Sequence, residues 1–130
     1  MTHHVEYNTS EKGLRTILTD WQEAALRIIW ANPGGIDSWT VWVMVNEYLK
    51  PKTISRASII NFLEAMRDAD ILDGVEVTGK GGLRWIYTPA MNEREFKNFI
   101  ISILISHLLR NFPNEIRLSM TKLNNILWEN

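Results

Sequence analysis

The sequence lacks cysteine entirely and has only three histidines, two of them in the N-terminal segment and one, His107, in an apolar stretch. Without thiols the chain can form neither a disulfide framework nor a cysteine zinc site, and thiolate catalysis is excluded. Catalysis also needs titratable groups that converge on one place, and these histidines are dispersed. We therefore expect a protein that is not an enzyme and that has no metal site and no cofactor.

Long hydrophobic runs are also missing. The most apolar stretch, residues 99–109, is about half of the roughly 20 residues that a membrane-spanning helix needs. The polar first residues contain no apolar signal region. We expect a soluble, cytoplasmic protein that does not associate with a membrane.

Positive and negative charges are nearly balanced, because the sequence has 14 Lys and Arg and 15 Asp and Glu, which gives a net charge of -1. A nucleic-acid partner would therefore have to be held by a local basic patch. The chain is rich in apolar residues, since 45% of its residues are hydrophobic and six are tryptophans. This content is sufficient to form one folded core. We expect three of the tryptophans to fill that core: Trp39, Trp42 and Trp85. The alternative is that these three side chains line a cavity for a ligand.

Capping residues divide the first half of the chain into three predicted helices. Thr19, Ser38 and Ser55 each stand before a segment whose apolar residues have helical spacing. The third helix, residues 55–70, has an apolar face made of Ile59, Phe62, Leu63 and Met66. Its opposite face must then point outward and carries Ala57, Asn61, Glu64 and Asp68.

A polar hairpin is predicted after these helices, over residues 76–88, "EVTGKGGLRWIYT". Two short β-type runs flank residues 78–83, whose three glycines give the tip the flexibility of a hairpin loop. Lys80 and Arg84 lie at this tip. Three helices followed by a hairpin is the order of a winged helix-turn-helix.

Two further helices are predicted at the C-terminus, over residues 92–111 and 119–128. Asn92 caps the first of them, and Glu95 completes a variant of the capping box. This helix is apolar around nearly its whole circumference, so it must be covered on several sides. We expect the cover to come from a second copy, with the last helix folding back as a compatible alternative. The expected interface comprises Phe96, Phe99, Ile100, Ile103, Leu104, His107, Leu108, Ile126 and Leu127.

From Leu18 to Leu127, about 85% of the chain, the sequence resembles the penicillinase-repressor type of winged helix-turn-helix transcriptional regulator. The stretches that carry the resemblance are "LTDWQEAALRIIW", "ISRASIINFLEAMRDADIL" and "GLRWIYTPAMNEREF". The resemblance implies a mainly α fold with a small β-hairpin. It also implies a flexible tail (1–17), a winged-helix DNA-binding domain (18–91) and a helical dimerisation region (92–130).

The resemblance further implies a homodimeric repressor that binds double-stranded DNA at a palindromic operator. Residues 55–70 would enter the major groove, and the wing, residues 76–88, would follow the adjacent backbone. Short polar residues at the front of this helix would reach base edges or phosphates, and cations near its N-terminus and in the wing would bind phosphate. The expected DNA contacts are Lys50, Lys52, Arg56, Ser58, Asn61, Lys80 and Arg84.

One departure from the family pattern supports a different function. Where those repressors commonly have lysines and a glycine, this chain has Asp68 and Asp70, and Glu64 is also expected on the outward face. From residue 50 to residue 84 there are six cations against five carboxylates. The alternative is therefore a winged-helix adaptor that binds a protein, without specific DNA binding.

Overall fold

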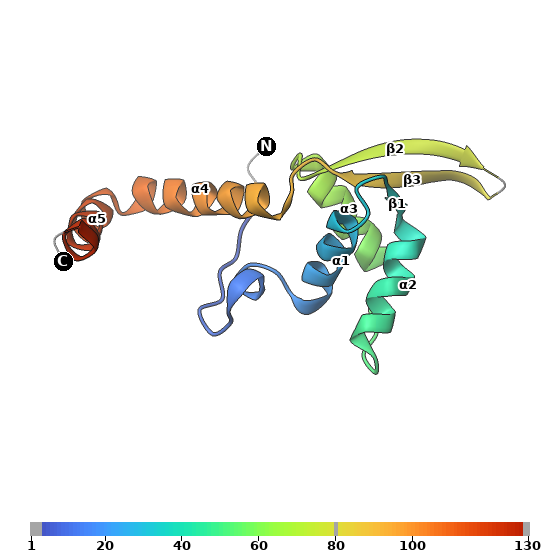
Figure 1. Cartoon of the computed structure of the whole chain (residues 1–130), viewed down its shortest axis with the longest axis horizontal. Coiled ribbons are helices and arrows are strands. Elements are labelled where there is room, and N and C mark those ends of the chain that lie inside the picture. The colour runs from blue at the N-terminus through green and yellow to red at the C-terminus, as the bar shows by residue number, and fades with distance from the viewer. Residues whose placement is uncertain (1–3, 80, 129–130) are drawn as a thin grey trace. The chain divides into compact units, whose positions relative to one another are not determined.

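The computed structural model describes residues 4–79 and 81–128, and divides the chain into two compact units, Met1–Phe96 and Lys97–Asn130 (Figure 1). Lys80, at the tip of the expected wing, lies outside the described residues. The described chain is mainly helical, with one small antiparallel sheet of three strands. At this level the predicted fold class, mainly α with a small β-hairpin, is confirmed.

The first unit contains the three predicted helices and the sheet. A 3-10 helix, η1 (Gly13–Thr16), precedes them. The helices are α1 (Asp20–Trp30), α2 (Ser38–Leu49) and α3 (Arg56–Asp68), and the strands are β1 (Ile36–Asp37), β2 (Leu72–Gly79) and β3 (Gly82–Pro89).

The sheet has the order β1-β3-β2, with both pairings antiparallel. β2 and β3 pair along their whole length, from Leu72 opposite Pro89 to Gly79 opposite Gly82, so they extend further towards the tip than predicted. β1 pairs with β3 through Ile36 and Tyr87, and it was not predicted, because two residues are too short to show an alternating pattern. This strand fastens the segment between α1 and α2 to the hairpin.

The core of the first unit lies among the three helices. On α3 the predicted apolar face is confirmed, since Ile59, Phe62, Leu63 and Met66 are at most 7% exposed. They pack with buried residues of the other two helices: Ala25, Leu26 and Ile29 from α1, and Val41, Val45 and Leu49 from α2. Trp21 meets Phe62 edge to face, with the ring centroids 5.4 Å apart. This packing fixes which face of α3 points outward.

Two of the three predicted N-caps are confirmed, and one is corrected by a single residue. The Thr19 and Ser55 side chains accept from the backbone N–H groups of Gln22 and Ser58, respectively. Ser38 is not a cap but the first residue of α2, and Asp37 caps this helix by accepting from the Thr40 N–H at 2.8 Å. Aspartate and serine are equally good caps, so the sequence alone did not separate these neighbours.

The chain leaves the sheet through α4 (Glu93–Asn111), which is followed by α5 (Pro113–Trp128). The predicted capping box of α4 is confirmed, since Asn92 and Glu95 each accept a hydrogen bond from the other's backbone N–H, at 2.8 and 3.0 Å. α5 begins at Pro113 rather than at the predicted Ser119. Proline suits the first helical position, because its missing N–H would have no partner there.

Both ends of the first unit differ from the predicted boundaries. In the predicted tail, Leu14 is only 4% exposed, and the backbone N–H of Asn8 donates to Thr16 at 2.6 Å. At the other end the first turn of α4 belongs to this unit, where Phe96 packs on Trp30 with the ring centroids 5.8 Å apart. Phe96 is 1% exposed and is covered within this unit, which corrects its prediction as a dimer-interface residue.

Gly35 offers a test of how firmly β1 is attached. Its φ is +117°, and an added Cβ would lie 2.6 Å from Cγ2 of Ile86. We expect Gly35→Ala to lower the free energy of unfolding by about 2 kcal/mol in a urea titration, because it adds backbone strain and a clash. Gly34→Ala is the matched control, since its Cβ would meet nothing within 4 Å, and it should change the stability by less than about 0.5 kcal/mol. Equal effects of the two changes would contradict this account.

Candidate functional site

A groove of about 460 Å³, which we call the polar groove after its charged residues Asp37, Arg56 and Arg84, lies where α2, α3 and the hairpin come together. Its lining comprises Asp37, Ser38, Trp39, Arg56, Gly79, Gly81, Gly82, Leu83 and Arg84. The structure therefore places Arg56 and Arg84, two of the predicted DNA contacts, on one surface. The N-termini of α2 and α3 both end at this groove, and their backbone N–H groups favour a negative charge.

Arg84 is not free in this groove. Its Nη1 lies 3.0 Å from Oδ2 of Asp37, while Oδ1 of the same carboxylate caps α2. Burial alone would raise the pKa of Asp37, but the hydrogen bonds from Thr40 and the charge of Arg84 outweigh it and hold the pKa below its usual value. The sequence analysis missed Asp37, and the only signal was its place one residue before the expected cap.

Arg56 differs from Arg84 in having no partner. It is the exposed first residue of α3, and its guanidinium makes no hydrogen bond or ion pair with the residues that the structure describes. An unpaired guanidinium at a helix N-terminus can donate hydrogen bonds to a phosphate without first losing an internal partner.

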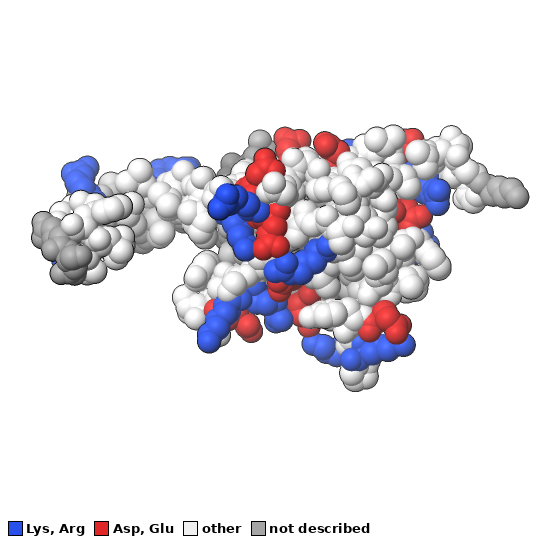
Figure 2. All heavy atoms as spheres, in the orientation of Figure 1, with Lys and Arg blue, Asp and Glu red and all other residues white. Residues whose placement is uncertain are grey.

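The two predicted lysine contacts are paired with carboxylates outside this groove. Lys50 lies 2.9 Å from Glu47, and both side chains are well exposed. Lys52 lies 2.7 Å from Asp20 at the start of α1, and the hydrogen bond from Lys52 is the main reason that the pKa of Asp20 is lowered. On the face of the first unit shown in Figure 2, the described cations and carboxylates are interspersed rather than gathered by sign.

Ser58 and Asn61 line a different hollow, of about 430 Å³, on the side of α3 that faces α1. The hydroxyls of Ser58 and Ser55 are 2.8 Å apart, so Ser58 is engaged at the helix cap. Asn61 is exposed. Because Arg56 and Ser58 are two residues apart on a helix, they point to different sides, and the outward face of α3 lies between the two hollows.

Glu64 does not project freely from this outward face, which corrects the prediction. Its carboxylate accepts a hydrogen bond from the Tyr87 hydroxyl at 2.5 Å and one from Arg67 at 2.6 Å. These bonds, that of Tyr87 first, outweigh burial and lower the pKa of Glu64, whereas burial and the nearby carboxylate raise the pKa of Tyr87. Arg67 in turn lies 4.4 Å from the ring centroid of Trp85. The charge of Glu64 thus ties α3 to β3 instead of repelling phosphate.

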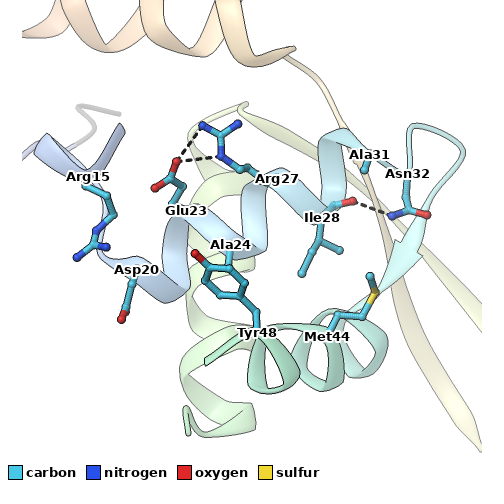
Figure 3. Close-up of a pocket in the computed structure, with 10 residues that line it drawn as sticks. All are labelled: Arg15, Asp20, Glu23, Ala24, Arg27, Ile28, Ala31, Asn32, Met44 and Tyr48. Carbon is cyan, nitrogen blue, oxygen red and sulfur yellow. Dashed lines mark hydrogen bonds and ion pairs between the residues drawn. The ribbon is translucent and has the colours of Figure 1, made fainter. Parts of the chain in front are cut away.

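A second, more apolar groove of about 420 Å³ runs between α1 and α2. Figure 3 shows Tyr48 and Met44 reaching from α2 towards α1, where Ala24 and Ile28 lie, and towards Ala31, which follows α1. Its polar side chains are mostly engaged with one another or with the backbone, as in the pair of Glu23 and Arg27 at 2.9 Å. No candidate residue from the sequence analysis lines this groove.

The tryptophans that might have formed a ligand cavity lie apart. The indole N–H of Trp42 donates to the Ile54 carbonyl at 2.9 Å, and Trp85 stacks under Arg67. Trp39 is 52% exposed and lines the polar groove, which corrects its prediction as a core residue.

The second unit exposes much of its apolar surface in the single chain. α5 has no buried residue among those described, and Leu123, Ile126 and Leu127 are between 52% and 68% exposed. On α4, Ile101, Ile105 and Leu109 are between 44% and 51% exposed. Of the other predicted interface residues, Phe99, Ile103 and Leu104 are half-buried, and His107 and Leu108 are exposed.

Within the described residues no three His, Asp or Glu side chains gather in a way that could hold a metal ion. None of the helices in that part of the chain is long and apolar enough to cross a membrane. Comparison of the chain with models of protein families, with curated proteins and with solved structures gives no match.

The bond between Tyr87 and Glu64 can be tested by its dependence on pH. The folded pKa of Glu64 lies below its usual value of 4.5, so this carboxylate stabilises the fold above that pH and ceases to do so as the pH falls through the folded value. Tyr87→Phe should lower the free energy of unfolding by about 1.5 kcal/mol at pH 7, and by less at about pH 3, in urea titrations.

Tyr48→Phe is the matched control, because Tyr48 is 73% exposed and its hydroxyl is in reach of water. It should leave the stability unchanged at both pH values. If Tyr87→Phe lowers the free energy of unfolding by the same amount at pH 7 and at pH 3, the charged carboxylate of Glu64 is not the cause of the loss.

Proposed function

We propose that the protein is a dimeric DNA-binding transcriptional regulator of the winged helix-turn-helix type, and a repressor, as its resemblance to the penicillinase repressors implies. The first unit supports this with its order of elements: α1, a short strand, α2, α3 and then a two-stranded hairpin. The observation that carries the proposal is the polar groove, because it joins the N-terminus of α3, Arg56, Arg84 and the hairpin on one surface.

The outward face of α3 has a suitable shape for the major groove. Its exposed residues are Ala57, Asn61, Ala65 and Asp68. The two alanines let the helix approach the bases closely, and the amide of Asn61 can pair with an adenine edge. Asp68 lies in the last turn and limits how far the helix can follow the phosphates.

The near-neutral surface does not argue against this function. Lys50, Lys52 and Arg84 are each more than half exposed in their ion pairs. Exposed ion pairs contribute at most about 1 kcal/mol, so a phosphate can replace the carboxylate at small cost. Binding that must displace internal pairs will be weaker and more selective than binding by a uniformly basic surface.

The second unit supports a homodimer. The exposed apolar residues of α4 and α5 need cover, and an equivalent pair of helices from a second copy provides a matching surface. Two copies related by a two-fold axis would present two α3 helices to the half-sites of a palindromic operator.

The DNA-binding proposal is tested with a fluorescently labelled duplex of about 20 base pairs and arbitrary sequence. Arg56→Ala should weaken binding about fivefold at low salt and reduce the slope of log affinity against log salt by about one, because it removes one phosphate contact. Arg84→Ala should reduce both quantities less, because Arg84 must leave Asp37 before it can bind a phosphate. Fluorescence anisotropy at several salt concentrations measures both quantities.

Arg94→Ala is the matched control, since it removes the same charge from the first turn of α4, at the end of the sheet opposite the hairpin tip. Its affinity should stay within twofold of the wild type. Absence of binding by the wild type at low salt, or an equal loss in all three variants, would contradict a phosphate site in the polar groove.

The dimer is tested by mass in solution. Leu123→Glu places a charge on the apolar face of α5 and should shift the protein from dimer to monomer at micromolar concentration in sedimentation equilibrium. Asn124→Glu adds the same charge at the next, polar position and should leave the dimer intact. A wild type that sediments as a monomer at these concentrations would rule the dimer out.

A second candidate function, binding of a protein partner, is favoured by the outward face of α2. Trp39 and Val43 are 52% and 40% exposed and lie four residues apart, so they share one side of this helix, whereas Tyr48, which is 73% exposed, lies on the opposite side. Exposed apolar side chains of this kind are typical of a surface that binds another protein. Failure to bind DNA at low salt, together with an intact fold, is the result that this adaptor function predicts.

A further inference from the structure

We infer that Asp37 acts as an internal competitor of the DNA phosphate for Arg84, and so sets how tightly the polar groove binds DNA. The inference rests on the proposed function, and it assigns to Asp37 a role separate from its capping of α2. The carboxylate would hold Arg84 in the free protein, and a backbone phosphate would take its place in the complex.

The two partners differ in how firmly they are held. Asp37 is 16% exposed and is fixed twice, by its hydrogen bond to the Thr40 N–H and by its place opposite Ile86 in the sheet. Arg84 is 60% exposed and lies in β3 two residues beyond the first residue of the strand, Gly82, whose φ is +96°. Any exchange of partners must therefore come from movement of the arginine, while the carboxylate stays in the groove.

The negative charge of Asp37 acts on a phosphate in two ways. It occupies Arg84, and it also lies in the same groove as the unpaired Arg56, where it repels any anion that Arg56 attracts. The first effect means that Arg84 must give up an internal partner before it can bind the DNA. The second opposes binding even after Arg84 has moved.

Capping of α2 does not by itself require this charge. Asparagine and serine cap a helix about as well as aspartate, since all three accept from the same backbone N–H group. An uncharged residue at position 37 would therefore keep the start of α2, while it would remove the ion pair with Arg84 and, with it, the competition. This separation makes the inference testable.

The test compares Asp37→Asn with the wild type on the same arbitrary duplex at low salt. We expect Asp37→Asn to bind about fivefold more tightly, and the slope of log affinity against log salt to become steeper by about one, because one more cation is available for phosphate. Asp37→Ser is the second variant and should behave in the same way. Thermal unfolding checks that both keep the wild-type fold.

Glu23→Gln is the matched control for total charge. It also removes one carboxylate from an ion pair with an arginine, but on α1 and outside the polar groove. Its affinity should stay within twofold of the wild type. A gain equal to that of Asp37→Asn would show that net charge is the cause, and would overturn the inference.

The link to Arg84 is tested by combining the changes. Adding Arg84→Ala to Asp37→Asn should abolish most of the gain in affinity, whereas Arg84→Ala alone should have a smaller effect because its arginine is already occupied. If the wild type binds DNA and neither Asp37→Asn nor Asp37→Ser binds more tightly, the competition does not exist. If neither the wild type nor these folded variants bind, the proposed function itself fails.

Discussion

The carboxylate of Asp37 joins more of the first unit than any other polar group described above. It is the last residue of β1, caps α2 and pairs with Arg84 on β3, so a single side chain connects the strand, the start of the helix and the part of the hairpin near its tip. The groove beside α3 exists because these three elements are held together. A carboxylate is well suited to this task, since its two oxygens can accept from two directions at once.

A second carboxylate joins the hairpin to α3. Glu64 on α3 accepts from Tyr87 on β3 and from Arg67, and Arg67 covers the ring of Trp85. The hairpin is thus attached to both α2 and α3 through half-buried carboxylates. In each case an acid that might have weakened the binding of an anion is instead used for structure, although Asp37 still faces the groove.

The sequence predicted those parts of the fold that depend on local patterns. The apolar face of α3, the caps at Thr19 and Ser55, the Asn92 and Glu95 pair and the glycine-rich hairpin all follow from spacing and residue type within one segment. It did not predict β1, because two residues carry no periodicity, or the burial of Phe96, which depends on where α4 begins in space. For the site, sequence placed Arg56 and Arg84 among the candidates but could not show that a distant Asp37 would pair with one of them.

The hydrogen bond between Glu64 and Tyr87 affects how the exposed surface of α3 can change during evolution. α3 is anchored by its apolar face and by this bond, so its exposed positions 57, 61, 65 and 68 contribute little to folding. Substitutions at these four positions are free to accumulate without loss of the scaffold. A gene duplicate could therefore acquire a different recognition preference through a few surface changes, while the shared framework stays intact.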